Sequence, residues 1–214
     1  MKKMLYVAVS AFCLYVQAAC ASIMVNWDFS GGLTGWTSSG SVNAFGGGAV
    51  ITDNGVLRSI LYQGVVLSPG SYFLSFDFIN ALSGVVPAGQ AYDSMFASLY
   101  FSTTPGLFDP QTVTGFDSFS ALVDVDDNTA TPTIGTVASS PLGGLYQQYA
   151  ATFSVSQTST VFFVLDFVDL NTVNNDSSFL VDNVSLIVPE PSIVALMLIG
   201  GGLGIRSMRR RKTA

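Results

Sequence analysis

The chain contains no histidine, a single glutamate, and two cysteines, Cys13 and Cys20, that both lie near its start. Beyond Cys20, catalysis by Ser-His-Asp or Cys-His groups is excluded, as are imidazole-bound transition-metal sites and disulfides. Any function of the main part of the chain therefore depends on aspartate, hydroxyl, amide and aromatic side chains.

Basic residues are almost missing from residues 22–188. Only Arg58 lies there, together with all thirteen aspartates, so this stretch has a formal charge of −12, against −6 for the whole chain. A domain this acidic repels nucleic acid and anionic lipid surfaces and attracts divalent cations. We therefore expect no nucleic-acid partner.

The same 167 residues are sufficient for one domain with its own core. Helix-forming lysine, arginine and glutamate are nearly absent, and no amphipathic helix stands out. Apolar residues alternate instead with a period of two, which predicts an all-β, antiparallel β-sandwich of the jelly-roll type whose last strand covers about 178–188. The alternating runs are Tyr72, Leu74, Phe76 and Phe78; Met95, Ala97, Leu99 and Phe101; and Val161, Phe163, Leu165 and Phe167.

A weak internal similarity relates residues 62–78 to residues 149–167. Each segment consists of an apolar stretch, a short polar turn and an aromatic-rich stretch that ends in Asp-Phe. The pattern predicts two similar hairpins.

The start of the chain has the layout of an export signal. Lys2 and Lys3 precede an apolar stretch over residues 4–16, and small residues follow at 19–21. This predicts a signal peptide over 1–21, cleaved after Ala21. A lipoprotein acylated on Cys20 is the alternative.

The end of the chain combines a rigid motif, an apolar run and a basic cluster. Pro189, Glu190 and Pro191 form an extended spacer, because proline fixes φ and removes a hydrogen-bond donor. The run over 193–205 predicts a single hydrophobic helix in the inner membrane, although its thirteen residues would span only about 20 Å of a core of about 30 Å. The basic residues behind it, which would stay cytoplasmic, are Arg206, Arg209, Arg210, Arg211 and Lys212.

This order resembles the PEP-CTERM sorting signal of Gram-negative bacteria that make exopolysaccharide. The resemblance covers residues 188–212 and implies an exosortase, a membrane protease-transpeptidase, as a partner that recognises Pro189, Glu190 and Pro191. It implies export, transient inner-membrane anchoring through 193–205, and final placement at the cell surface or in the extracellular matrix. The chain then divides into a signal peptide (1–21), a β-sandwich domain (22–188) and a sorting signal (189–214). An ordinary tail anchor is the alternative.

The two ends of the domain resemble jelly-roll modules related to carbohydrate-binding domains. The opening segment Asn26-Trp27-Asp28-Phe29-Ser30-Gly31-Gly32-Leu33-Thr34-Gly35-Trp36 is similar to their first strand and turn, and residues 179–186 are similar to their last strand. The resemblance implies a structural calcium ion held by Asp28 or Ser30 together with Asp182. No other cofactor is expected.

A second calcium candidate is the acidic run over residues 124–128. Its D-x-D-x-N spacing is typical of the start of a calcium loop, but Thr129 and Gly135 occupy the positions where an EF-hand carries glycine and glutamate. A solvated acidic loop is the alternative.

Three functions are compatible with these features. The first is a non-catalytic surface or matrix protein associated with exopolysaccharide, and the second is a carbohydrate-binding module with a defined glycan. For that module, Trp36 is the main candidate ligand platform, because sugars stack on aromatic faces; the other candidates are Tyr92, Tyr100, Tyr146 and Tyr149. A glycosidase that uses two of Asp77, Asp166 and Asp169 comes last, and we expect no enzyme.

Overall fold

The computed structural model describes residues 22–82, 91–104, 106, 108–126, 129–170 and 177–188. The predicted signal peptide (1–21) and sorting signal (189–214) lie outside these residues. None of the described residues belongs to a helix that is long and apolar enough to cross a membrane.

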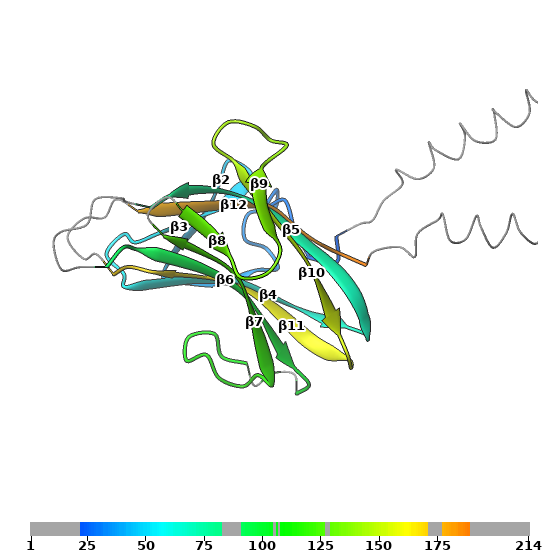
Figure 1. Ribbon diagram of the computed structural model, residues 1–214. Coiled ribbons are helices and arrows are strands. Elements are labelled where there is room, and N and C mark those ends of the chain that lie inside the picture. Colours follow the sequence, from blue (N-terminus) through cyan, green and yellow to red (C-terminus); the bar gives the residue numbers. More distant parts are fainter. Residues whose placement is uncertain are drawn as a thin grey trace, which may run out of the picture. The chain divides into compact units, whose positions relative to one another are not determined.

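The described strands form two six-stranded sheets in which all neighbours are antiparallel, and the two sheets pack face to face (Figure 1). This confirms the predicted all-β sandwich. Sheet A contains, in order, β1 (Thr37–Ser39), β4 (Arg58–Leu67), β11 (Ser159–Val168), β6 (Ser94–Ser102), β7 (Ser118–Asp126) and β8 (Thr129–Pro132). Sheet B contains β2 (Ser41–Phe45), β3 (Gly48–Thr52), β12 (Ser178–Ile187), β5 (Gly70–Ala81), β10 (Gln147–Val155) and β9 (Thr136–Ser139).

The core lies between the sheets and consists of the inward faces of the long strands. The predicted alternation is confirmed on β5, where Leu74, Phe76 and Phe78 are fully buried. On β11, Leu165 and Phe167 face inward in the same way. Neighbouring residues of a strand point to opposite faces, so each period-two run in the sequence marks one wall of the core.

The two predicted hairpins are wrong. Strand β4 lies in sheet A and β5 in sheet B, while β10 lies in sheet B and β11 in sheet A. The pairing joins β4 to β11 and β5 to β10 instead. The two similar segments are therefore two connections that cross from one sheet to the other. Each connection joins two strands that both contribute residues to the core.

Both side edges of the sandwich are closed by a chain segment that passes from one sheet to the other. At one edge Gly40 joins β1 to β2, and at the other Gly135 lies between β8 and β9. Both glycines have a positive φ, of 80° and 79°. A Cβ at Gly40 would lie 2.5 Å from the Arg58 carbonyl oxygen, and one at Gly135 would lie 2.7 Å from the Ala151 Cβ. Only glycine fits these two corners.

Candidate functional site

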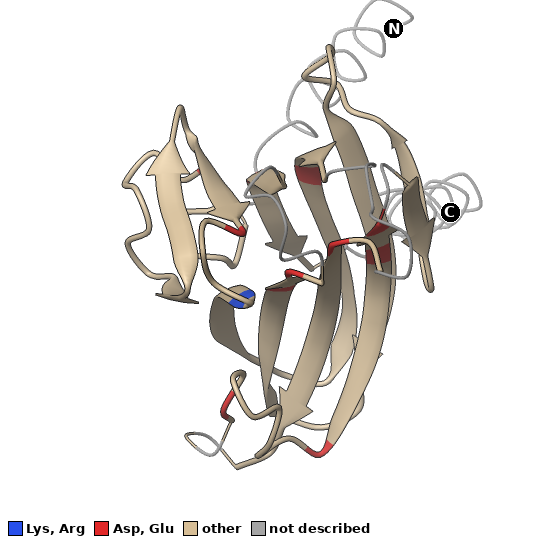
Figure 2. Ribbon diagram, turned by 90° about the vertical axis from the view of Figure 1, so that its left-hand side faces the viewer, with Lys and Arg blue, Asp and Glu red and all other residues tan. Residues whose placement is uncertain are grey.

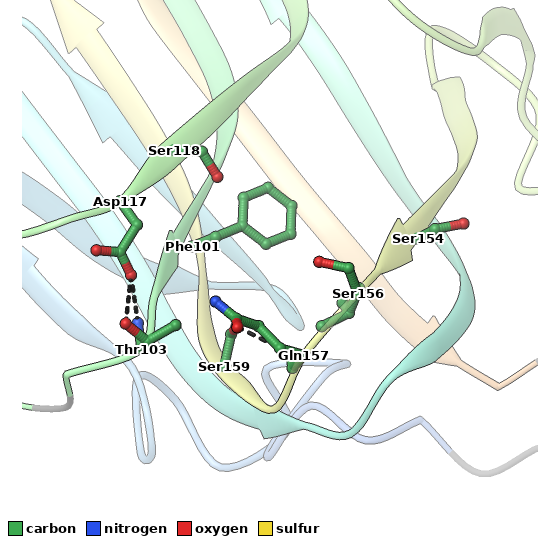
Figure 3. A pocket seen from close by; sticks show the side chains of 9 residues that line it. Phe101, Thr103, Asp117, Ser118, Ser154, Ser156, Gln157 and Ser159 are labelled. Atoms are coloured by element: carbon green, nitrogen blue, oxygen red, sulfur yellow. Dashed lines mark hydrogen bonds between the residues drawn. The ribbon is translucent and has the colours of Figure 1, made fainter.

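A pocket with a volume of about 150 Å³ opens at one end of the sandwich, between the two sheets. It lies where β6 and β10 end and where β7 and β11 begin. The residues that line it are Phe101, Thr103, Asp117, Ser118, Ser154, Val155, Ser156, Gln157 and Ser159. We call it the Phe101 pocket (Figure 3).

The ring of Phe101 is the aromatic surface of this pocket. The Phe101 ring packs against the Phe153 ring in a T-shaped arrangement, with the two centroids 6.0 Å apart and the planes at 69°. In Figure 3 the hydroxyl groups of Ser118 and Ser156 lie on either side of the Phe101 ring. An apolar ring bordered by hydroxyl groups matches the two kinds of surface that a sugar presents, its C–H face and its hydroxyl edge.

A fixed carboxylate forms part of the rim. Asp117 Oδ2 accepts hydrogen bonds from the backbone amide and the hydroxyl of Thr103, at 2.6 and 2.7 Å. These two bonds lower the pKa of Asp117 below its ordinary value, because they stabilise the charged form. The Asp117 amide also donates to the Phe101 carbonyl oxygen at 2.8 Å. The carboxylate is therefore ionised at neutral pH and held in one orientation.

The opposite rim comes from the turn between β10 and β11. Gln157 and Ser156 lie there, on the other side of Phe101 from Asp117 (Figure 3). The Ser159 hydroxyl donates to the Gln157 carbonyl oxygen at 3.0 Å, which fixes the backbone of the turn. The pocket thus combines an aromatic ring, a carboxylate, a primary amide and several hydroxyl groups.

The ligand platform predicted at Trp36 is wrong. Its side chain is only 7% exposed, and its ring contacts Phe29 and Phe163 in the core. The Trp36 indole Nε1 donates to the Asn26 carbonyl oxygen at 3.2 Å. Trp27, in contrast, is 41% exposed.

The four tyrosines predicted as possible sugar-binding platforms differ in how exposed they are. Tyr149 is fully buried and donates its hydroxyl to the Ile134 carbonyl oxygen, so it is no platform. Tyr100 lies on the outer face of sheet A, where its ring packs against Phe108 and Phe116 of the segment between β6 and β7. Tyr92 is 39% exposed, and Tyr146 is partly buried.

The predicted calcium ligands make separate local contacts. Asp28 Oδ1 accepts from the amide and the hydroxyl of Ser30, at 3.2 and 2.9 Å. Asp182 Oδ1 accepts from the Asn183 amide at 2.6 Å. Within the described ranges no three acidic side chains are grouped as a metal site would need. In the second calcium candidate, the acidic run over residues 124–128, Asp124 and Asp126 lie on β7, and residues 127 and 128 lie outside the described residues.

Asp77 and Asp166, two of the three carboxylates considered for a glycosidase, do not face each other. Asp166 lies on β11 of sheet A, where it pairs with Arg58 at 2.6 Å. Asp77 lies on β5 of sheet B, where it accepts from Ser140 at 2.7 Å and from Asn183 at 3.0 Å. Both alternate with inward-facing core residues, so they point away from the core on opposite sheets. Figure 2 shows the acidic positions spread over many elements.

No protein-family model matches the chain, and no curated protein matches its sequence significantly. Among solved structures, the enzymatically active domain of bacteriophage CBA120 tailspike protein 4 is similar, with a TM-score of 0.49 and 13% identity over 78% of this chain and 21% of that chain. The module TmCBM61, solved with β-1,4-galactotriose, has a TM-score of 0.46 and 14% identity over 79% of this chain and 99% of its own. The module CBM4 has a TM-score of 0.41 and 10% identity over 77% and 98%. The similar structures thus include carbohydrate-binding modules, and at these identities the likeness concerns the fold alone.

Proposed function

We propose that residues 22–188 form a non-catalytic carbohydrate-binding domain of an exported protein and that the Phe101 pocket is its ligand site. The observation that supports this best is the aromatic ring of Phe101 surrounded by hydroxyl, amide and carboxylate groups at the open end of the sandwich. Asp117 would accept hydrogen bonds from sugar hydroxyl groups, and Gln157 would donate and accept them.

The pocket restricts the size and charge of the ligand. Its volume of about 150 Å³ is below the range of about 300–1,000 Å³ that is usual for drug-sized ligands. It therefore fits a single sugar ring at a chain end or branch better than a long oligosaccharide. The Asp117 carboxylate and the −12 charge of the domain disfavour anionic sugars, so the ligand is a neutral one.

Binding can be tested with a fragment of residues 22–188, because every described strand and core residue lies within it. A glycan array would identify a ligand, and isothermal titration calorimetry would measure its affinity. Asp117→Asn and Gln157→Ala should each weaken binding about tenfold, since one hydrogen bond to a charged or polar group contributes about 1.4 kcal/mol.

Asp109→Asn is the matched control. Asp109 is another loop carboxylate that accepts from a threonine hydroxyl, that of Thr112 at 2.7 Å, but it does not line the pocket. Its substitution should leave the affinity unchanged. Equal losses for Asp109→Asn and Asp117→Asn would show that general charge, and not the pocket, governs binding.

The proposal includes sorting through the C-terminal segment. It is supported by the order of the Pro-Glu-Pro motif, the apolar run and the basic cluster in the sequence. Glu190→Ala should leave the fold unchanged, since position 190 lies beyond β12, while the precursor should accumulate in the inner membrane. Mass spectrometry of the surface form should find no Arg209–Lys212 tail. Surface protein that retains this tail would identify an ordinary anchor instead.

Calcium binding by Asp28 and Asp182 stays part of the proposal as a structural role. A bound ion would stabilise the folded state by mass action. Millimolar Ca²⁺ should then raise the melting temperature of residues 22–188 more than Mg²⁺ does, and Asp182→Ala should abolish the difference. Equal shifts with both ions would reduce the effect to screening of the negative charge.

A further inference from the structure

A second pocket, with a volume of about 400 Å³, lies at the opposite end of the sandwich and is lined by polar residues throughout. They are Ser41, Asn43, Thr52, Asp53, Asn54, Ser177 and Ser178. We call it the Thr52 pocket. The function proposed above does not use it.

The pairing of three strands builds one wall of this pocket. Thr52 on β3 is in register with Ser41 on β2 and with Ser178 on β12, so three hydroxyl groups form a row across sheet B. The hydroxyl groups of Ser41 and Thr52 are 2.7 Å apart and share a hydrogen bond. Neighbouring strands are about 4.8 Å apart, which spaces these hydroxyl groups regularly.

A buried carboxylate holds the other wall in place. Asp53 is only 1% exposed, and its Oδ2 accepts from the Ser177 amide at 3.1 Å. The Asp53 amide donates in return to the Ser177 carbonyl oxygen at 3.4 Å. This reciprocal pair fixes the start of β12 against the end of β3, so the polar wall is pre-organised.

The chemistry of the lining limits what this pocket can bind. Hydroxyl and amide groups donate and accept hydrogen bonds, and the carboxylate only accepts them. Among the described residues that line the pocket there is no cationic side chain, which disfavours anionic ligands, and no aromatic or aliphatic one, which disfavours apolar ligands. A neutral polyhydroxylated ligand satisfies these groups best.

We infer that the Thr52 pocket is a second glycan-binding site, which takes a neutral oligosaccharide segment through hydrogen bonds and without stacking. This inference rests on the function proposed above, because it assigns the same ligand class to a second place on the domain. At about 400 Å³ the pocket has room for more than the single ring that fits the Phe101 pocket.

The two pockets are far enough apart for one domain to bridge two glycan chains. Strand β5 runs between them, since Gly70 is in register with Val155 of the Phe101 pocket and Ala81 with Ser178 of the Thr52 pocket. The eleven steps from Gly70 to Ala81 span about 36 Å at about 3.3 Å each. A domain with a site at each end would crosslink a polysaccharide, and its avidity would exceed the affinity of either site.

Nuclear magnetic resonance of ¹⁵N-labelled residues 22–188 tests this inference. The probes are cellohexaose, xylohexaose, mannohexaose and maltohexaose, each added to millimolar concentration. At least one of them should shift the amide signals of Thr52, Asn54 and Ser178. Thr52→Val and Asn54→Ala should each weaken that interaction at least threefold, whereas Thr152→Val, which removes an exposed hydroxyl elsewhere on sheet B, should not.

The two sites can fail independently. If no hexasaccharide shifts the signals of the Thr52 pocket, the second site is overturned, whatever happens at Phe101. If shifts occur at Thr52 and persist unchanged in Thr52→Val and Asn54→Ala, the assignment is overturned as well. Shifts confined to Thr103, Asp117 and Gln157 would leave the proposed function standing without the second site.

Discussion

Arg58 and Asp166 form a two-pronged ion pair on the outer face of sheet A. Arg58 Nε donates to Asp166 Oδ1 at 2.7 Å, and Nη2 donates to Oδ2 at 2.6 Å. The same guanidinium donates to the carbonyl oxygens of Pro110 and Gln111, at 3.2 and 2.6 Å. The single basic residue of the domain therefore ties the segment between β6 and β7 to the sheet.

Loss of this guanidinium should destabilise the domain and release that segment. Arg58→Met removes four hydrogen bonds but leaves a partly buried carboxylate, and we expect a cost of about 1–3 kcal/mol, because both side chains keep some contact with water. Urea unfolding would measure the cost, and limited proteolysis should show faster cleavage within residues 108–117. Arg58→Lys keeps the charge but not the planar fork, so it should recover only part of the stability. Wild-type stability and cleavage in Arg58→Met would refute the anchoring role.

The closed edges of the sandwich predict that a glycine-to-alanine substitution costs more stability at Gly40 and Gly135 than at Gly143. At Gly143, where φ is 74° and a Cβ would meet nothing within 4 Å, alanine should cost only the strain of a left-handed backbone, about 1–2 kcal/mol. At Gly40 and Gly135 the Cβ also collides with the facing strand, so the total should exceed about 3 kcal/mol. Equal costs at all three positions, measured by chemical unfolding, would show that the corners are not sterically closed.

Replacing Asp182 or Asp109 with asparagine should change the melting temperature at pH 7 in opposite directions. Burial raises the pKa of Asp182 above its ordinary value of 3.8; the Asn183 amide opposes this, and the charges of Asp77 and Asp28 add to it. Because the pKa is raised, folding favours the protonated form of Asp182. Its contribution to stability is therefore present at low pH and is lost as the pH rises through the folded-state pKa. Asp182→Asn should therefore raise the melting temperature at pH 7, and the gain should disappear below about pH 4.

Asp109 provides the opposite case. The Thr112 hydroxyl and the Gln111 amide lower the pKa of Asp109, so its contribution is present above 3.8 and is lost as the pH falls through the folded pKa. Asp109→Asn should lower the melting temperature at pH 7 and leave it unchanged in strong acid. Since each substitution removes one negative charge, shifts of the same sign in both variants would mean that net charge alone determines the result.

The two tryptophans should differ in fluorescence. Trp27 is half-exposed and Trp36 is buried, so acrylamide should quench the emission of the Trp36→Phe variant strongly and that of the Trp27→Phe variant weakly. A sugar that binds in the Phe101 pocket should leave the emission of Trp36 unchanged. If the ligand shifted the Trp36 emission in the Trp27→Phe variant, the sugar would bind at Trp36, as the sequence predicted, and not in the Phe101 pocket.

The sequence predicted the walls of the core but not the connections between them. Phe76 and Leu165 follow from alternation, which depends only on the two-residue repeat of a strand. A turn such as Ser68-Pro69 can join two strands of one hairpin or two strands of different sheets. Its composition therefore does not show that β4 and β5 lie in different sheets. Trp27 and Trp36 lie outside such alternation, in a segment organised by hydrogen bonds from Gly31 to the Asn26 side chain and from Trp36 to the Asn26 carbonyl.

The Phe101 pocket could not be predicted for a different reason. Its lining comes from the ends of β6 and β10 and the starts of β7 and β11, which are up to about sixty residues apart in the chain. Phe101 belongs to one of the predicted alternating runs, but only the pairing of the strands shows that it lies at the open end of the core. Serine, threonine and glutamine have no spacing that distinguishes a binding rim from an ordinary turn.

A crystal structure of residues 22–188 with the best glycan from the array is the most direct test of the proposed function. We expect one sugar ring to stack on Phe101 and to form hydrogen bonds with Asp117 and Gln157. A glycan seated elsewhere, for example on the exposed ring of Trp27 with the Phe101 pocket empty, would contradict the assignment of the site, and the absence of any glycan ligand on the array would contradict carbohydrate binding itself.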